Sequence, residues 1–79
     1  MQNTFRIHVK TFDEKTHDYI FRSLGEATYA FFMYMGDTVH RLELHQCMND
    51  DSSQDRLIIH ASRMIAGEPM KVRRTFNIF

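Results

Sequence analysis

Apolar and polar residues alternate in the first predicted element, residues 4–11. Phe5, Ile7 and Val9 share one face of this segment, and basic residues stand between them. A period of two is typical of a strand with one buried face. A polar turn with Asp-Glu-Lys follows, and residues 17–22 are rich in β-branched and aromatic side chains, which indicates a second strand. We therefore predict a β-hairpin over residues 4–22.

Residues 23–36 carry the clearest local signals of the chain. Ser23 and Glu26 form a capping-box pattern, in which the hydroxyl accepts a hydrogen bond from the Glu26 amide. Gly36 is placed to end the last turn in the left-handed conformation. The apolar residues spaced at about 100° per residue form one wide stripe: Leu24, Ala27, Ala30, Phe31, Tyr34 and Met35. We predict a helix of about three turns that packs on a sheet through this stripe.

The opposite side of this predicted helix is apolar as well. Tyr29, Phe32 and Met33 occupy positions where a surface helix normally carries charged residues. Such residue types are enriched at protein interfaces. Two interpretations stay open: these side chains bind a partner or a second copy, or the monomer covers them with its C-terminal arm or with a helix over residues 56–66.

Alternation returns in residues 39–47, which we interpret as a third strand. One face would carry His40, Leu42, Leu44 and Gln46, and the other Val39, Arg41, Glu43, His45 and Cys47. Residues 49–53 are acidic and rich in turn-forming residues, which predicts a loop.

Residues 56–66 fit two structures. A strand would place Leu57, Ile59 and Ala61 on one face, paired with residues 39–47. A helix would align Leu57, Ile58, Ala61, Met64 and Ile65, with Ser52 and Asp55 as a capping box and Gly67 and Pro69 as stop signals. We favour the strand because Leu-Ile-Ile-His is rich in strand-forming residues. The alternating residues 70–79 predict a terminal strand or an extended arm, with Met70, Val72, Arg74, Phe76 and Ile78 on one side.

These elements predict a single α+β domain of 79 residues. It would be a small antiparallel sheet with one helix packed on one face, in the order ββαββ, with a C-terminal strand or arm and residues 56–66 as an alternative second helix. The other face of the sheet would carry Arg6, His8, Lys10, Arg41, Glu43 and His45.

Ten basic and ten acidic residues cancel, so the net charge does not argue for nucleic acid or a membrane as a partner. The charges are nevertheless uneven, since residues 37–55 are acidic and residues 56–79 are basic. Basic residues on the predicted strand face and in the tail are candidate contacts for nucleic acid or an acidic partner: Arg6, Lys10, Arg41, Lys71, Arg73 and Arg74. RNA-binding sheets usually add exposed aromatic residues, whereas the strand aromatics here mostly alternate toward the core.

No catalytic, cofactor or metal residue is predicted. His45 and Cys47 share a strand face, but no further ligands complete a zinc site and no third group completes a nucleophilic triad. No glycine-rich phosphate loop is present. Cys47 is the single cysteine, which excludes an internal disulfide and favours a reducing compartment. Because the sequence shows no signal peptide and no membrane span, we expect a cytoplasmic protein. Because it shows no catalytic motif, we expect a protein that is not an enzyme.

This profile of small size, one domain, no catalytic motif and an interaction-rich surface resembles the short accessory proteins of phages and mobile elements, such as anti-CRISPR proteins. The resemblance implies a stoichiometric inhibitor that binds a host defence complex and blocks nucleic-acid loading or nuclease recruitment. It assigns no role to any numbered residue.

Three functional hypotheses follow from the sequence. The first is a protein-binding module, with a homodimer as one form, and with the phage-type inhibitor as its specific case. The second is a small nucleic-acid-binding regulator that uses the basic strand face and the tail. The third is a minor subunit of a larger assembly that docks through the outward face of the helix.

Overall fold

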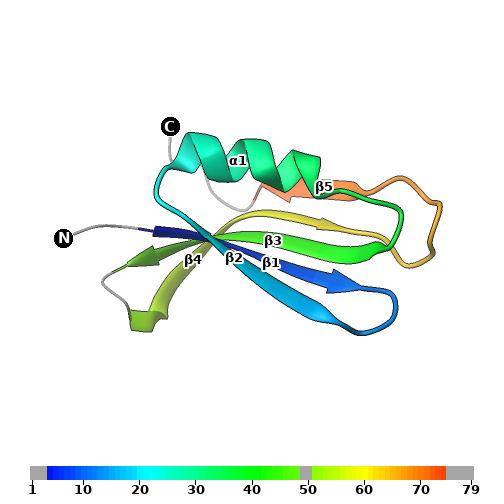
Figure 1. Ribbon diagram of the computed structural model, residues 1–79, viewed down its shortest axis with the longest axis horizontal. Helices are drawn as coiled ribbons and strands as arrows, with labels where there is room; N and C mark the ends of the chain where they lie inside the picture. Colours follow the sequence, from blue (N-terminus) through cyan, green and yellow to red (C-terminus); the bar gives the residue numbers. More distant parts are fainter. Residues whose placement is uncertain (1–3, 49–50, 75–79) are drawn as a thin grey trace.

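The computed structural model describes residues 4–48 and 51–74. In chain order their elements are β1 (Thr4–Thr11), β2 (Thr16–Phe21), α1 (Leu24–Met33), β3 (Val39–Met48), β4 (Asp51–Ser62) and β5 (Lys71–Arg74). Neighbouring strands are antiparallel and form one open sheet in the order β2-β1-β3-β4-β5. The helix lies across one face of this sheet (Figure 1), in contact with β1, β2 and β3. The predicted α+β class is confirmed.

The N-terminal hairpin has the predicted partners, with Phe5 opposite Phe21 and Lys10 opposite Thr16. Its turn is closed by the Thr11 amide, which donates to the Lys15 carbonyl at 2.9 Å. Glu14 takes the left-handed conformation, with φ of 68°, as the last residue of a three-residue hairpin loop commonly does.

The helix begins where the capping pattern predicted. The Ser23 hydroxyl accepts a hydrogen bond from the Glu26 amide at 3.1 Å, and Ser23 itself is extended. The helix ends earlier than predicted, at Met33, and Tyr34 caps it. The prediction for Gly36 was wrong, since Gly67 is the glycine with a positive φ among the described residues. The Gly36 amide instead donates to the Tyr34 carbonyl at 2.9 Å, so the chain turns without a left-handed residue.

The core lies between α1 and the sheet. Its buried apolar side chains come from the helix and from β1, β3 and β4: Phe5, Ile7, Val9, Ala27, Ala30, Phe31, Val39, Leu42, Leu44, Ile58, Ile59 and Ala61. Leu24 and Met35 pack against this cluster and are partly buried. Tyr34, predicted to face the sheet, lies at the rim, where its ring is 4.8 Å from that of Tyr19. The predicted facing of the helix is therefore correct, with Tyr34 only partly covered.

Residues 51–62 form a strand, so the alternative helix over residues 56–66 is wrong. β4 pairs with β3, where Leu42 and Leu44 lie opposite Ala61 and Ile59. This pairing buries apolar side chains from both strands against the core, which outweighs the helical spacing of the same residues. Residues 51–53 belong to the strand and not to the predicted loop, whereas residues 49–50 lie outside the described residues.

Two irregularities in the register change which side chains are buried. Leu44 pairs with Ile59 and His45 with Leu57, so Ile58 is an extra residue and is buried beside Ile59. Leu57 therefore lies on the His45 face, contrary to the strict alternation that we predicted.

The second irregularity lies at the start of β3. Lys10 pairs with Arg41 and Thr11 pairs with Val39, so His40 is the extra residue. Val39 is consequently buried rather than sharing a face with Arg41. Such bulges shift the face of every residue beyond them.

β5 confirms the predicted terminal strand for Lys71–Arg74, which pairs with β4. Residues 75–79, including Phe76 and Ile78 of the predicted alternation, lie outside the described residues. No helix in the described part of the chain has the length and apolar character needed to cross a bilayer.

Candidate interaction surfaces

The outward face of α1 is apolar and open. Tyr29, Phe32 and Met33 are 70%, 53% and 64% exposed, and Glu26 is the one charged residue among the ten of the helix. If each side chain presents about 200 Å² when fully exposed, the three leave on the order of 400 Å² of apolar surface uncovered. A patch of this size is comparable to the largest apolar patch on a typical monomer. We call these three residues the helix patch.

The monomer does not cover the helix patch in the described part of the chain. The segment that might have formed a covering helix is β4, and β5 lies at the far edge of the sheet. Phe32 is held by an edge-to-face contact with the buried ring of Phe31, with centroids 5.3 Å apart. The helix patch is therefore a preformed surface, because the opposite side of the helix packs against the core through Ala27, Ala30 and Phe31.

The outer face of the sheet, opposite α1, is polar and mainly basic. The register places these residues on it: Arg6, His8 and Lys10 from β1, Asp18 from β2, Arg41, Glu43 and His45 from β3, His60 and Ser62 from β4, and Lys71 and Arg73 from β5. The described side chains of this face thus include five permanent cations and two carboxylates, although the net charge of the whole chain is zero.

Three of these cations form one row across the sheet. Lys10 lies directly opposite Arg41, Arg41 opposite Ser62, and Ser62 opposite Lys71. We call Lys10, Arg41 and Lys71 the cationic row. Like charges directly opposite each other on neighbouring strands repel, so the row concentrates positive charge on this face. Of the other predicted contacts, Arg74 pairs with Ile59 and lies on the helix side of the sheet.

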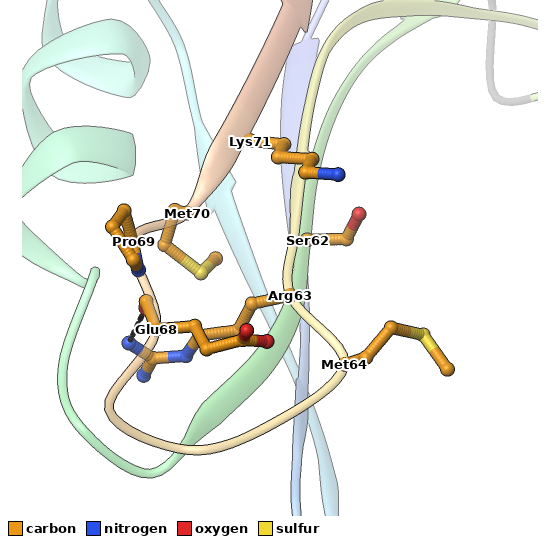
Figure 2. Close-up of a pocket in the computed structure, with 7 residues that line it drawn as sticks. All are labelled: Ser62, Arg63, Met64, Glu68, Pro69, Met70 and Lys71. Carbon is orange, nitrogen blue, oxygen red and sulfur yellow. Dashed lines mark hydrogen bonds between the residues drawn. The ribbon is translucent and has the colours of Figure 1, made fainter.

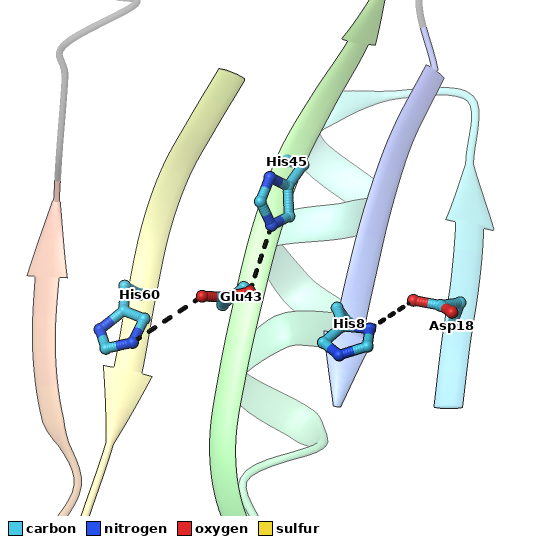
Figure 3. A network of polar contacts seen from close by, with 5 residues as sticks. All are labelled: His8, Asp18, Glu43, His45 and His60. Atoms are coloured by element: carbon cyan, nitrogen blue, oxygen red, sulfur yellow. Dashed lines mark hydrogen bonds and ion pairs between the residues drawn. The ribbon is translucent and has the colours of Figure 1, made fainter. Parts of the chain in front are cut away.

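A second row carries histidines and carboxylates (Figure 3). His8 Nδ1 lies 2.7 Å from Asp18 Oδ1, with the carboxylate accepting. Glu43 stands between two imidazoles: its Oε1 is 3.4 Å from His45 Nε2, and its Oε2 is 4.0 Å from His60 Nε2. Imidazoles and carboxylates, which can hydrogen-bond to each other, thus alternate along this row, and such pairs support cross-strand pairing.

These groups do not converge on one point. The two imidazoles approach different oxygens of Glu43, and within residues 4–48 and 51–74 no set of three histidine, cysteine or acidic side chains could hold a metal ion. Cys47 is half-buried. The row is therefore best described as part of the sheet's polar surface.

A hollow of about 410 Å³ opens beside the loop between β4 and β5 (Figure 2). It is lined by Ser62, Arg63, Met64, Glu68, Pro69, Met70 and Lys71. The guanidinium of Arg63 is engaged in structural contacts here: Nε donates to the Val39 carbonyl at 2.9 Å, and Nη1 donates to the Glu68 carbonyl at 3.1 Å. Its Nη2 donates to the Gly36 carbonyl.

Further contacts tie Arg63 to the first hairpin and to β3. Its guanidinium carbon lies 5.7 Å from the centre of the Phe12 ring, and the backbone carbonyl of Arg63 accepts from His40 Nδ1 at 2.6 Å. Arg63 thus joins three loops, namely the hairpin loop with Phe12, the loop after α1 with Gly36 and the loop before β5 with Glu68. Sequence reasoning counted it among the basic residues of the second half of the chain and missed this role, because the three loops meet only in the folded chain.

No protein-family model, no curated protein and no solved structure matches this chain.

Proposed function

We propose that this protein is a non-enzymatic protein-binding module that docks through the helix patch. The observation that carries the proposal is the exposure of Tyr29, Phe32 and Met33 on a helix that is otherwise held firmly by the core. Exposed apolar area gains nothing from folding and favours association. Two aromatic residues and a methionine combine rigid anchors with an adaptable side chain, as protein interfaces often do.

The helix patch alone is smaller than one side of a standard protein–protein interface. A standard interface buries about 800 Å² on each side, so a patch on the order of 400 Å² supplies about half. Burying it at about 25 cal/mol per Å² contributes on the order of 10 kcal/mol, and the cost of association removes much of this gain. The partner therefore also has to contact polar surface around the helix.

The specific form that we propose is a stoichiometric inhibitor of the phage type, which binds a host defence complex. Its small size and the preformed helix patch support such a role, since an inhibitor of this kind acts by occupying a surface. A minor subunit of a larger assembly would use the same patch. The two differ in stoichiometric behaviour: an inhibitor titrates the activity of its target to an endpoint proportional to the amount added, whereas a subunit is required for that activity.

The test compares two double variants with the same change in chemistry. Phe32→Glu with Met33→Lys places opposite charges in the helix patch and leaves the net charge unchanged. Met64→Lys with Ile65→Glu does the same in the loop before β5, where Met64 and Ile65 are 82% and 63% exposed. Both variants should keep the far-UV circular dichroism of the wild type.

The readout is the set of proteins that the tagged chain recovers from a bacterial lysate. We expect one recurrent complex with the wild type and with the loop variant, and its loss with the helix variant. A helix variant that unfolds would place these side chains in the core, and a folded helix variant that still recovers the complex would move the binding surface elsewhere. Either result contradicts the proposal.

A second candidate function is binding of nucleic acid through the outer face. The specific observation in its favour is the cationic row, in which Lys10 lies directly opposite Arg41. Each phosphate that such residues neutralise releases counterions, so binding would weaken steeply with salt. We rank it second because the described side chains of this face include two carboxylates and no exposed aromatic residue between the cations.

Its test uses charge reversals on the two faces of the sheet. Lys10→Glu with Lys71→Glu changes the cationic row, and Arg56→Glu with Arg74→Glu makes the same charge change on the helix side. Only the first pair should abolish binding of a labelled oligonucleotide and flatten its dependence on salt concentration. Nanomolar binding by the wild type at physiological salt would place this function above the first.

A further inference from the structure

The two edges of the sheet differ in chemistry. Within the described residues, three of the four residues of β5 are Lys71, Arg73 and Arg74, and Pro69 lies two positions before the strand. Charged residues and proline at an edge are among the features by which natural sheets block pairing with another chain. β2, at the opposite edge, has six residues without lysine, arginine or proline, and five of them are exposed. β2 is therefore the edge that accepts a further strand.

The hairpin determines which backbone groups of β2 point outward. The hydrogen bond from the Thr11 amide to the Lys15 carbonyl makes this a hydrogen-bonded pair, and such pairs recur at every second position of an antiparallel ladder. His17, Tyr19 and Phe21 thus bond to β1. The N–H and C=O groups of the residues between them, Asp18 and Ile20, point away from the sheet.

Ile20 is an exposed apolar residue on the outer face, whereas Leu57 there is partly buried. It lies opposite Arg6, on the polar face of the sheet, and is 61% exposed. An exposed apolar side chain on an unpaired edge strand favours association with a further strand. On the helix side the same edge presents Tyr19, which rests against Tyr34 at the rim of the core.

The charge of Asp18 in β2 and that of Arg22, which directly follows β2, favour a second copy of the chain as the partner and also favour one register. A two-fold axis at Asp18 would bring two carboxylates face to face, which is unfavourable. An axis at Tyr19 would place Asp18 against Ile20 of the second copy. An axis at Ile20 pairs Ile20 of one copy with Ile20 of the other. It also places Asp18 of each copy opposite Arg22 of the other, which gives one such pair on each side of the axis.

We propose that β2 pairs antiparallel with β2 of a second copy about a two-fold axis at Ile20, which joins two five-stranded sheets into one continuous sheet. On the helix side, Tyr19 of one copy then lies beside Phe21 of the other. Such an isologous contact satisfies both open edges at once.

The helices do not obstruct this arrangement. α1 contacts β1, β2 and β3 and so is centred near β1. The two β1 strands would be three strand spacings apart, about 14 Å at ~4.8 Å per strand. Directly packed helices are only about 8–10 Å apart, so the helix patches stay open. The dimer and the proposed binding function are therefore separable.

The first test is the mass of the full chain in solution, by sedimentation velocity at protein concentrations up to about 1 mM. We expect a dimer for the wild type and a monomer for Ile20→Lys, which puts two ammonium groups at the axis. Ile65→Lys is the matched control, since Ile65 is similarly exposed but outside β2; it should stay dimeric. A monomeric wild type, or a dimeric Ile20→Lys variant, would overturn the proposal.

Two further experiments test the register. Asp18→Arg and Arg22→Asp should each weaken the dimer, and the double variant should restore it, because both ion pairs are then rebuilt in the reverse sense. Ile20→Cys in a Cys47→Ala background should form a covalent dimer under mild oxidation, since hydrogen-bonded pairs have Cα atoms about 5.5 Å apart, which suits a disulfide. Failure of both the restoration and the cross-link refutes an axis at Ile20.

The helix-patch variant Phe32→Glu with Met33→Lys separates this proposal from the proposed function. We expect it to stay dimeric while losing the lysate partner, and we expect Ile20→Lys to keep that partner. A helix-patch variant that becomes monomeric would assign the dimer contact to α1 and overturn pairing through β2.

Discussion

Replacing Arg63 tests whether one side chain joins the three loops at the end of the sheet. Arg63→Ala removes three hydrogen bonds to backbone carbonyls and the contact with the Phe12 ring. A hydrogen bond from a charged group is worth about 1.5–3 kcal/mol when buried and less when exposed. The bond to Val39 is partly buried and the other two are exposed, and an exposed cation–π contact adds about 0.5–1 kcal/mol.

The expected loss is therefore about 3 kcal/mol, a large share of the roughly 4–12 kcal/mol expected for 79 residues. It should lower Tm by about 12–24 °C, since a domain of this size loses about 4–8 °C per kcal/mol. Arg63→Lys should recover little, because an ammonium group cannot reach three carbonyls in one plane.

Urea unfolding followed by circular dichroism measures the change in free energy of unfolding. Arg73→Ala is the control, because Arg73 is an exposed arginine on a neighbouring strand; it should change stability by no more than about 0.5 kcal/mol. An Arg63→Ala variant as stable as this control would refute the assignment of Arg63 as the residue that joins the loops.

Three other predictions concern the core, a turn and the first hairpin. Phe31→Ala should cost about 3–5 kcal/mol because the ring is fully buried; an unchanged Tm would contradict the facing of the helix. Gly67→Ala should cost about 1–2 kcal/mol, since Gly67 has φ of 92°, whereas Gly36→Ala should be nearly neutral in the same unfolding experiment. Hydrogen bonds from the Thr11 hydroxyl and the Lys15 amide lower the pKa of Asp13 below its ordinary value of 3.8. Their contribution to stability is thus present above the unfolded pKa and lost as pH falls through the folded one; in an NMR titration Thr11→Val should raise the Asp13 midpoint, and an unchanged midpoint would contradict this cause.

Local patterns determined most of the secondary structure. The alternation of Phe5, Ile7 and Val9 identifies β1, the β-branched and aromatic residues of 17–22 identify β2, and the cap at Ser23 identifies the start of α1. Each of these signals depends on residues only a few positions apart in the chain. The same local information placed Tyr29, Phe32 and Met33 away from the sheet, which their exposure in the structure agrees with.

Tertiary pairing decided what local patterns left open or misplaced. The sequence of residues 56–66 fits both a strand and a helix. The strand forms because pairing with β3 buries Ile59 and Ala61 together with Leu44 and Leu42 in the core. At each of the bulges that bury Val39 and Ile58, one strand has one residue more than its partner. Because a bulge is a property of the pair of strands, the spacing of residues within one strand does not predict it.

The candidate surfaces show the same division. Sequence alternation assigned Arg6, Lys10 and Arg41 to one polar face, but only the strand order brings Lys71 into the same row and sends Arg74 to the other side. The open edge at β2 and the role of Arg63 also depend on the strand order, because a residue's neighbours across a sheet are set by pairing between distant segments. The sequence by itself thus determined most of the elements and the apolar faces of β1 and α1. The tertiary structure decided the state of residues 56–62, the faces beyond the bulges, and which faces and edges the described chain leaves exposed.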